Sequence, residues 1–439
     1  MKFQFEKLGA LDKKTEIELG DLTIICGKNN TGKTYISYAI YGFLKHWKRH
    51  IHFKLASEQI NRLLKNGVLK LDLQTFEKDI HQVVEGLSQR YTQSLPAILS
   101  ANEDYFSETL FRAVINADYQ PNYQLALHCS QGTKNQPVLE AIKEKEHFLL
   151  NIISLVKDES ILPPATIINR FINVNLGKVL LGDYFANPFM MTSERTGIAL
   201  FHKKLYRLEP TDYEFHFSQY SLPIENEIDF THHLIESSKR KSKLIKAHPE
   251  LLGLLKDIVG GEYQVADDQI YFIDLNVPKN PRKIPLYMAS SAVKSLLDLS
   301  FYLKHIAKKG DILLIDEPEQ YLHPANQRKI ARLFVRLIKA GIKVFVTTQS
   351  DYLIKELNHL ILLGNEFEDK EEIMKKYGYT KEDILNKSLV QGYIAEKQTL
   401  FPATIDEMGI EVNSFDREIN EMNRMYNDIT VTMECAYDN

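Results

Sequence analysis

The stretch LTIICGKNNTGKTYISYAI, residues 22–40, decides the fold because it predicts three elements in a row. Apolar residues from 22 to 26 indicate a strand that is buried on both faces. A loop follows in which Gly27, Gly32, Lys33 and Thr34 have the spacing G-x-x-x-x-G-K-[ST]. Apolar residues at helical intervals come next. Strand, loop and helix form the context in which this spacing builds a phosphate-binding loop.

Each residue type in this loop has a predicted task in binding a nucleotide. Gly27 and Gly32 let the backbone wrap closely, and the loop N–H groups and the start of the helix face the phosphates. Lys33 is expected to reach the β and γ phosphates, and Thr34 to offer an oxygen to Mg²⁺. The other predicted binding residues of the loop are Asn29, Asn30 and Thr31. The expected cofactors are therefore ATP and Mg²⁺.

A second apolar strand ends in acidic residues, in the stretch ILLIDEPEQYLHP at 312–324. Its strand would carry Asp316 to the carboxyl edge of the sheet, where the carboxylate can hold Mg²⁺ beside Thr34. Glu317 is the candidate base for an attacking water. Taken alone, such adjacent acids are often only a solvated strand end. The phosphate-binding loop makes the catalytic interpretation the better one.

A third apolar strand, KVFVTTQSDYLI at 343–354, places Gln349 at its tip. Strands that alternate with helices predict a mostly parallel sheet with crossover helices. The expected fold is therefore α/β, with the polar strand ends gathered at one edge.

Four stretches together resemble the ATP-binding-cassette (ABC) type ATPases of the non-transporter kind. This group includes SMC and RecF proteins and the overcoming-lysogenization-defect nucleases. The stretches are GKNNTGKT (27–34), ASSAVKSLLDL (289–299), DEPEQYLHPANQ (316–327) and TTQSDYLI (347–354). The resemblance covers the core only, roughly residues 1–48 and 268–360, and implies an ABC-type P-loop ATPase head.

The resemblance also implies a dimer. In the family, a signature loop contacts the γ phosphate held by a partner subunit, so that two heads enclose ATP as a homodimer or higher oligomer. Ser290 and Ser291 would make this contact here, although an ordinary helix N-cap is the alternative. The chain departs from the family twice, with Ala292 in place of glycine and Gln349 in place of histidine. An amide can bind a phosphate or water but cannot carry a proton as imidazole does, so we expect slow hydrolysis.

Arg195, in the stretch TSERTG, is a further candidate. Related ATPases often carry an arginine in such a turn, which suggests a contact with phosphate or between lobes. A structural salt bridge with Glu194 or another acid is the alternative.

Composition shifts along the chain suggest six segments. A helical insertion and a second helical segment would interrupt the ATPase core. The expected divisions are an ATPase lobe with the P-loop (1–48), a helical insertion (49–182), a return to the core (183–201), a second helical segment (202–267), an ATPase lobe with signature, acidic pair and switch (268–362) and a small mixed C-terminal segment (363–439). The end of the last segment is acidic and is either a docking tail or a solvated helix.

The overall composition limits the class of protein and the compartment that we expect. The chain has 54 basic and 58 acidic residues, a net charge of −4, which marks neither a nucleic-acid coat nor a membrane-surface protein. Cys26, Cys129 and Cys435 are too scattered for a disulfide framework or zinc site. The sequence has no apolar run of about 18 residues and no export signal. We therefore expect a cytoplasmic protein without membrane contact.

Two function hypotheses remain open. In the first, the ATPase is a switch for a separately encoded nuclease or toxin, as in the resembling anti-phage systems Septu, PARIS and the retron-associated ATPases. The segment after the last core helix is too short for a fused Toprim nuclease domain. In the second, it is a DNA-engaging ATPase of repair or chromosome maintenance. Basic clusters at Lys45–Lys54 and Lys239–Lys246 could bind nucleic acid, or could be solvated helix faces. A self-contained nuclease within 49–182 is a weaker third option.

Overall fold

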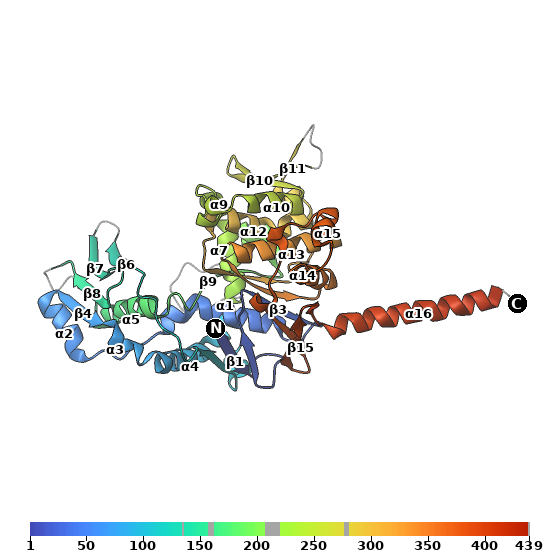
Figure 1. The fold of residues 1–439 in the computed structure, drawn as a ribbon. Helices are drawn as coiled ribbons and strands as arrows, with labels where there is room; N and C mark the ends of the chain where they lie inside the picture. Colours follow the sequence, from blue (N-terminus) through green and yellow to red (C-terminus); the bar gives the residue numbers. More distant parts are fainter. Residues whose placement is uncertain (134–135, 157–161, 207–219, 276–280, 438–439) are drawn as a thin grey trace. The chain divides into compact units, whose positions relative to one another are not determined.

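The computed structural model describes residues 1–439 except 134–135, 157–161, 207–219, 276–280 and 438–439 (Figure 1). The chain forms two compact units. The first holds Met1–Glu18 and Tyr38–Phe189, and the second holds Leu19–Ser37, Ile224–Asn439 and the segment that begins at Met190.

The second unit is built on a six-stranded sheet with the strand order β16-β15-β3-β14-β13-β9. In that order the strands are β16 (Thr399–Pro402), β15 (Val390–Glu396), β3 (Leu22–Gly27), β14 (Lys343–Thr348), β13 (Asp311–Asp316) and β9 (Asn187–Met191). β15, β3, β14 and β13 are parallel, and β16 pairs antiparallel with β15. Every residue of β3 and β13 is buried. The predicted α/β architecture with a mostly parallel sheet is confirmed.

Helices follow the parallel strands in the predicted alternation. They are α1 (Lys33–His50) after β3, α13 (Pro324–Lys339) between β13 and β14, and α14 (Asp351–Leu362) after β14. The carboxyl ends of parallel strands meet at one edge, so the three polar stretches identified in the sequence converge there.

The C-terminal part of the chain corrects the predicted domain division. β15 lies between β16 and β3 in the core sheet, so part of the predicted C-terminal segment 363–439 belongs to that sheet. Packing against this strand is close: a Cβ atom at Gly27 would lie 2.6 Å from the carbonyl oxygen of Ala395. Sequence alternation gave no sign of β15 because Val390–Glu396 mixes buried and half-buried positions without a clear period.

The second unit also contains a smaller antiparallel sheet, β10-β11-β12, a separate two-stranded pair and a set of helices. The strands are β10 (Gly261–Ala266), β11 (Gln269–Asp274) and β12 (Arg282–Pro285), with the small pair β17 (Ile405–Asp406) and β18 (Gly409–Ile410). The helices are α6 (Arg195–Tyr206), α7 (Leu222–His232), α8 (Leu234–Ser237), α9 (Lys243–Ala247), α10 (Glu250–Val259), α11 (Ser291–Ser295), α12 (Leu297–Phe301), the π-helical η4 (Tyr302–Ile306), α15 (Lys370–Tyr377), α16 (Asn413–Tyr437) and the 3₁₀ turns η3 (Leu286–Met288), η5 (Lys381–Asp383) and η6 (Lys387–Leu389).

The first unit contains two antiparallel sheets, ordered β2-β1-β5 and β4-β8-β7-β6. Their strands are β1 (Lys2–Glu6), β2 (Thr15–Glu18), β4 (Val68–Asp72), β5 (Leu110–Val114), β6 (Leu127–Thr133), β7 (Gln136–Lys143) and β8 (Leu149–Ser154). The helices are α2 (Ser57–Asn66), α3 (Leu73–Glu77), α4 (Ile80–Leu99), α5 (Ala165–Leu181) and the 3₁₀ turn η1 (Glu103–Phe106). The prediction that 49–182 is a helical insertion is therefore wrong in its secondary structure, because five strands lie among the described residues of that range. These strands are short, and a five-residue stretch such as VLKLD of β4 is also compatible with the end of a helix.

Aromatic packing fills the core of the first unit. Phe43, on α1, makes ring contacts with Phe3, Tyr91, Phe111 and Phe185 at centroid distances of 5.2–5.7 Å. The hydroxyl of Tyr91 donates a hydrogen bond of 2.6 Å to the carbonyl of Ala39, which satisfies the polar end of a fully buried ring. The C-terminal part of α1 thus forms the core of this unit.

Glu356 ties the two helices that flank β14. Its carboxylate is fully buried, and it accepts hydrogen bonds of 2.6 Å from Arg328 and Arg332, one turn apart on α13. Burial raises the pKa of this carboxyl, but the hydrogen bonds from Arg332 and Arg328 outweigh burial and hold the net pKa below its ordinary value. The ion pair therefore favours the folded state at neutral pH, and its contribution is lost as the pH falls through the depressed pKa.

We predict that Glu356→Ala lowers the free energy of unfolding at pH 7 by roughly 3 kcal/mol, because it leaves two arginines without their shared anion. Urea denaturation measures the change. The matched control is Glu366→Ala, which removes a 93% exposed side chain whose ion pair with Lys370 lies at the surface. That control should change stability by less than about 0.5 kcal/mol. Equal losses in the two variants would contradict the structural role of Glu356.

Candidate nucleotide site

The glycine loop between β3 and α1 has the conformation that a phosphate cradle requires. Asn30 and Gly32 have positive φ angles of 62° and 92°, so the loop turns sharply before α1 begins at Lys33. The Lys33 ammonium donates hydrogen bonds to the carbonyls of Gly27 (2.9 Å) and Lys28 (2.8 Å) and thus lies within the curve of the loop. Burial lowers the pKa of this ammonium, and the nearby Glu317 and Asp316 oppose that shift.

Asp316, at the end of β13, joins the loop to the neighbouring strand. Its carboxylate accepts hydrogen bonds from the Thr34 hydroxyl (2.9 Å) and from the Thr347 hydroxyl at the end of β14. Burial raises the pKa of the Asp316 carboxyl, while the hydrogen bonds from Thr347 and Thr34 oppose the shift. The sequence motifs predicted the proximity of Thr34 and Asp316, and the structure places the two side chains in direct contact.

Glu317 follows Asp316 in a left-handed backbone conformation with a φ angle of 49°. Its N–H donates to the carbonyl of Thr347 at 3.0 Å. One carboxylate oxygen accepts a hydrogen bond of 2.5 Å from the Gln349 amide, and the other accepts one of 2.6 Å from the Gln320 amide. Both oxygens of the candidate base are therefore occupied by amide donors.

Gln349 is fixed by a second acid. Its backbone N–H donates a hydrogen bond of 2.7 Å to Glu319, whose pKa is raised by burial. Ser350, next in the chain, caps α14 by accepting from the N–H of Leu353 at 3.1 Å. The strand tip that carries Gln349 is thus held on both sides, and the side chain points to Glu317.

Arg195 binds the backbone of the turn that carries Asp316 and Glu317, which we call the acidic turn. The guanidinium is buried at the start of α6 and donates to the carbonyls of Thr192 (2.8 Å), Asp316 (2.9 Å) and Glu317 (2.6 Å). Burial lowers its pKa, and the carboxylate of Glu227 makes the largest opposing contribution. Arg195 therefore holds the backbone of the acidic turn, a role that neither of its two sequence-based interpretations described.

A buried polar chain continues from Arg195 to the helix that follows the candidate signature. The carbonyl of Thr192 accepts from Arg195, and the N–H of Thr192 donates to Glu227 at 2.9 Å. Glu227 lies one turn before Thr231 on α7, and the Thr231 hydroxyl donates to Asp298 of α12 at 3.1 Å. Burial raises the pKa of Glu227, and burial raises that of Asp298 to about 7. The acidic turn and α12 are therefore linked through buried groups.

The candidate signature serines lie apart from these contacts, at the protein surface. Ser290 is the N-cap of α11 and accepts a hydrogen bond of 3.3 Å from the N–H of Val293. Ser290 and Ser291 are both exposed. The preceding Tyr287 and Met288 are 68% and 67% exposed, which leaves an apolar surface next to the serines. Ser290 therefore acts as an ordinary helix N-cap, as the alternative interpretation predicted. The side chain of Ser291 is exposed at the surface.

The two predicted basic clusters both have exposed lysines, but the first also has buried side chains. In the cluster Lys45–Lys54 the lysines and Arg49 are exposed, whereas Trp47, Ile51 and Phe53 are buried, so the cluster also has a packing role. The lysines of Lys239–Lys246 are exposed. No helix of the described residues is long and apolar enough to span a bilayer. Among the same residues, no group of three or more His, Cys, Asp or Glu side chains forms a protein-only metal site.

Sequence reasoning missed several site residues. It assigned no role to Thr347, Glu319 or Gln320, although all three lie within the quoted motifs. Their hydrogen bonds depend on which strands are neighbours, and the spacing of residues in one strand does not report that.

Comparisons with known proteins agree with this geometry. Residues 8–176 match the family described as "AAA ATPase domain". Residues 195–355 match the family described as "AAA domain, putative AbiEii toxin, Type IV TA system". No curated protein matches the sequence.

Several solved structures are similar at low identity. One is the SMC head bound to the C-terminal winged-helix domain of ScpA (10% identity, 92% of this chain and 98% of that chain, TM-score 0.36). Another is the SMC head domain from Thermotoga maritima (10%, 92% and 98%, TM-score 0.31). A third is the Smc head with an extended coiled coil, bound to the C-terminal domain of ScpA derived from Pyrococcus furiosus (11%, 96% and 98%, TM-score 0.31). Similarity at this level adds nothing to the observed strand order.

The first of the two matched ranges, 8–176, contains the P-loop, and the second, 195–355, contains the acidic strand and Gln349. The two matches to AAA domains, together with the P-loop and the acidic strand, indicate that the chain is an ATPase.

Proposed function

We propose that this ATPase is a slow, ATP-closed dimeric switch that controls a separately encoded effector, a nuclease or toxin, in bacterial anti-phage defence. The observation that carries the slow turnover is the state of Glu317, both of whose carboxylate oxygens accept amide hydrogen bonds. These two hydrogen bonds stabilise the carboxylate anion and so make Glu317 a weaker base toward water. The toxin and TA system in the description of the family that matches residues 195–355 support the defence setting.

The P-loop residues would bind the triphosphate. Gly27, Gly32 and the backbone N–H groups between them would surround the phosphates, with Asn29, Asn30 and Thr31 in the same loop. Lys33 would exchange the carbonyls of Gly27 and Lys28 for phosphate oxygens. This exchange is favourable because an ammonium–phosphate hydrogen bond joins two opposite charges.

Thr34 and Asp316 fit a Mg²⁺ ion. Their oxygens lie 2.9 Å apart, so one cation could contact both, directly or through water. The metal would neutralise charge on the phosphates. Thr347 would keep the carboxylate of Asp316 oriented, and Glu317 would orient or deprotonate the attacking water beside Gln349.

Dimer formation would depend on the exposed signature. Ser290 and Ser291 would reach the γ phosphate of the partner head. The exposed side chains of Tyr287 and Met288 would become buried against the partner head in the closed state. The buried chain from Asp298 through Thr231 and Glu227 to Arg195 would couple that contact to the acidic turn. ATP would thus favour the closed dimer because only that state makes the additional contacts.

The first test is the mass of the protein with and without ATP and Mg²⁺. Glu317→Gln should bind ATP, hydrolyse it at least about 100-fold more slowly and accumulate as a dimer, because the carboxylate base is gone. Lys33→Ala should weaken ATP binding roughly 100-fold and remain unchanged in mass upon ATP addition, since an ammonium–phosphate contact contributes about 3 kcal/mol. Light scattering and a phosphate-release assay measure both effects.

Lys28→Ala is the matched control, because its side chain is exposed in the same loop and its carbonyl is retained. It should behave as the wild type. Wild-type hydrolysis by Glu317→Gln would remove Glu317 from its role. An unchanged mass of Glu317→Gln with ATP would contradict the dimeric switch.

Gln349→His should raise the hydrolysis rate by about tenfold or more, since an imidazole can transfer a proton that an amide cannot. Steady-state phosphate release at saturating ATP measures the rate. The control is Gln398→His, the same substitution on an exposed turn between β15 and β16. A wild-type enzyme that already turns over rapidly, and that Gln349→His inactivates, would refute the slow-switch idea.

The helix α16 supplies the proposed effector contact. Met422, Met425, Tyr426, Ile429 and Met433 occupy positions i, i+3, i+4, i+7 and i+11, and their side chains are 53–70% exposed. This spacing places them on one helix face. The adjacent acidic residues Glu421 and Asp428 favour a partner groove with a basic rim. We name this apolar row the α16 stripe.

Ile429→Glu should reduce co-purification with the effector, encoded next to this gene, by at least about tenfold, because it places a charge in the centre of the α16 stripe. Val431→Glu is the control, since position 431 lies on the opposite helix face and is also exposed. ATP hydrolysis should be unchanged in both variants. Equal retention of the effector by both variants would contradict the docking role, and loss of self-association instead would reassign the stripe to contacts between copies.

A DNA-engaging ATPase is the second candidate. The exposed lysines of Lys45–Lys54 and Lys239–Lys246 favour it. It requires hydrolysis that rises with added DNA and falls with salt, whereas the effector switch requires neither.

A further inference from the structure

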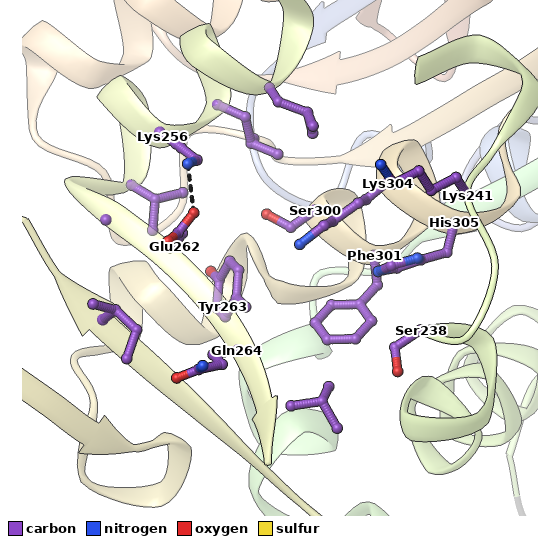
Figure 2. Close-up of a pocket in the computed structure, with 16 residues that line it drawn as sticks. Ser238, Lys241, Lys256, Glu262, Tyr263, Gln264, Ser300, Phe301, Lys304 and His305 are labelled. Atoms are coloured by element: carbon purple, nitrogen blue, oxygen red, sulfur yellow. Dashed lines mark ion pairs between the residues drawn. The ribbon is translucent and has the colours of Figure 1, made fainter. Parts of the chain in front are cut away.

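The second unit contains a cavity of about 570 Å³ away from the nucleotide-site residues. Its walls come from α10, β10, β11, the segment around Ser238 and Lys241, and the continuous path from α12 into η4 (Figure 2). A volume of this size is within the range of about 300–1,000 Å³ that small-molecule sites occupy. The cavity can therefore hold a molecule of the size of a mononucleotide or a small aromatic acid.

The cavity has an apolar body. Its apolar side chains come from helix α10, from the hairpin formed by β10 and β11, and from helix α12. They are Leu252, Leu255 and Val259 of α10, Val265 and Ile273 of the hairpin, and Phe301 of α12. Tyr263 adds a second ring, 6.2 Å from that of Phe301. Such a surface favours a ligand with an apolar or aromatic part.

Cationic groups gather at one side. Figure 2 shows Lys241, Lys304 and His305 together, across the cavity from the ion pair between Lys256 and Glu262. That pair is 2.5 Å long and neutralises the single carboxylate of the lining. Within the described part of the chain, the ion pairs leave Lys241 and Lys304 without a carboxylate partner. The lining therefore has an excess of positive charge that complements an anion.

The cationic side is held in place by unusual backbone geometry. Lys304 and His305 lie in the π-helical turn η4, and such turns often occur at functional sites. A 2.5 Å contact joins the Nδ1 atom of His305 to the carbonyl of Arg240, and the N–H of Ser242 donates to the carbonyl of Lys304 at 2.9 Å. These two contacts hold the η4 segment, with Lys304 and His305, against the segment that carries Lys241.

The cavity also contacts the helix that begins at the candidate signature. The hydroxyl of Tyr263 donates a hydrogen bond to the carbonyl of Val293 on α11. Val293, Leu297 and Phe301 pack in one core cluster with Tyr263, and Phe301 also faces the cavity. A ligand that presses on Tyr263 and Phe301 would therefore act on α11 and α12, the helices next to Ser290.

We propose that this cavity is a regulatory site for a small organic anion, with its phosphate, sulfonate or carboxylate group at Lys241 and Lys304 and its apolar part against Tyr263 and Phe301. The binding step stands on the cavity itself. The regulatory step rests on the proposed role of the signature serines in ATP-driven closure.

The binding test uses 8-anilinonaphthalene-1-sulfonate, an anion with an aromatic body, titrated into the full chain without ATP. The wild type should show a saturable fluorescence increase. The double variant Lys241→Glu/Lys304→Glu should weaken binding at least tenfold, because it reverses the charge of the cationic side. Val259→Trp should abolish the saturable component by filling the apolar side. Lys243→Glu, an exposed lysine of α9 outside the lining, is the matched control and should leave binding unchanged.

Equal binding by the charge-reversed double variant and the control would overturn the proposed site, even if Val259→Trp fails to fold. Complete competition by inorganic phosphate at the same concentration as the aromatic probe would overturn the organic class, because it would show that the apolar part contributes nothing. Competition by adenosine monophosphate, but not by phosphate, would support it.

The regulatory step has a separate readout. The probe should change the ATP-dependent dimer fraction of Glu317→Gln at least twofold, and should have no effect when Lys241 and Lys304 are both reversed. Binding without any change in the dimer fraction would overturn the regulatory step and leave the site in place. Absence of ATP-dependent dimers in the first place would count against the proposed function and not against the cavity.

Discussion

The carboxylate of Asp316 is the contact on which the site depends. It accepts hydrogen bonds from Thr34 after β3 and from Thr347 at the end of β14, so one buried side chain joins the ends of three neighbouring strands. Burial alone would favour its neutral form, and the two hydroxyl donors stabilise the anion. The contact depends on the order β3-β14-β13, which brings the carboxyl ends of these three strands side by side.

The same acidic turn explains why the site is organised before ATP binds. Arg195 donates to the carbonyls of Asp316 and Glu317, and this support holds Glu317 in a left-handed conformation that a residue with a side chain adopts at a cost. Two glutamine amides then fix the carboxylate. These two hydrogen bonds stabilise the anion and lower its basicity, and the proposed slow turnover rests on this feature.

The second unit has a second organised region in the β10-β11-β12 sheet and the short helices around it. The broken helix α11–α12–η4 passes from the exposed candidate signature serines to the cationic side of the cavity. The buried chain from Asp298 to Arg195 leaves the same helix toward the acidic turn. α12 thus lies between three features with proposed functions, which is why a ligand in the cavity could influence closure.

The sequence by itself determined the ATPase core. The apolar runs of β3 and β13 predicted strands that are buried on both faces, which the structure confirms, and the spacing of Gly27, Gly32, Lys33 and Thr34 predicted a phosphate loop between strand and helix. Only the tertiary structure decided the position of β15 beside β3, the strands within 49–182, the role of Arg195 and the glutamine pair on Glu317. Each of these depends on contacts between residues far apart in the chain. Local periodicity carries no information about such contacts, because it reports which face of an element is buried and not what covers it.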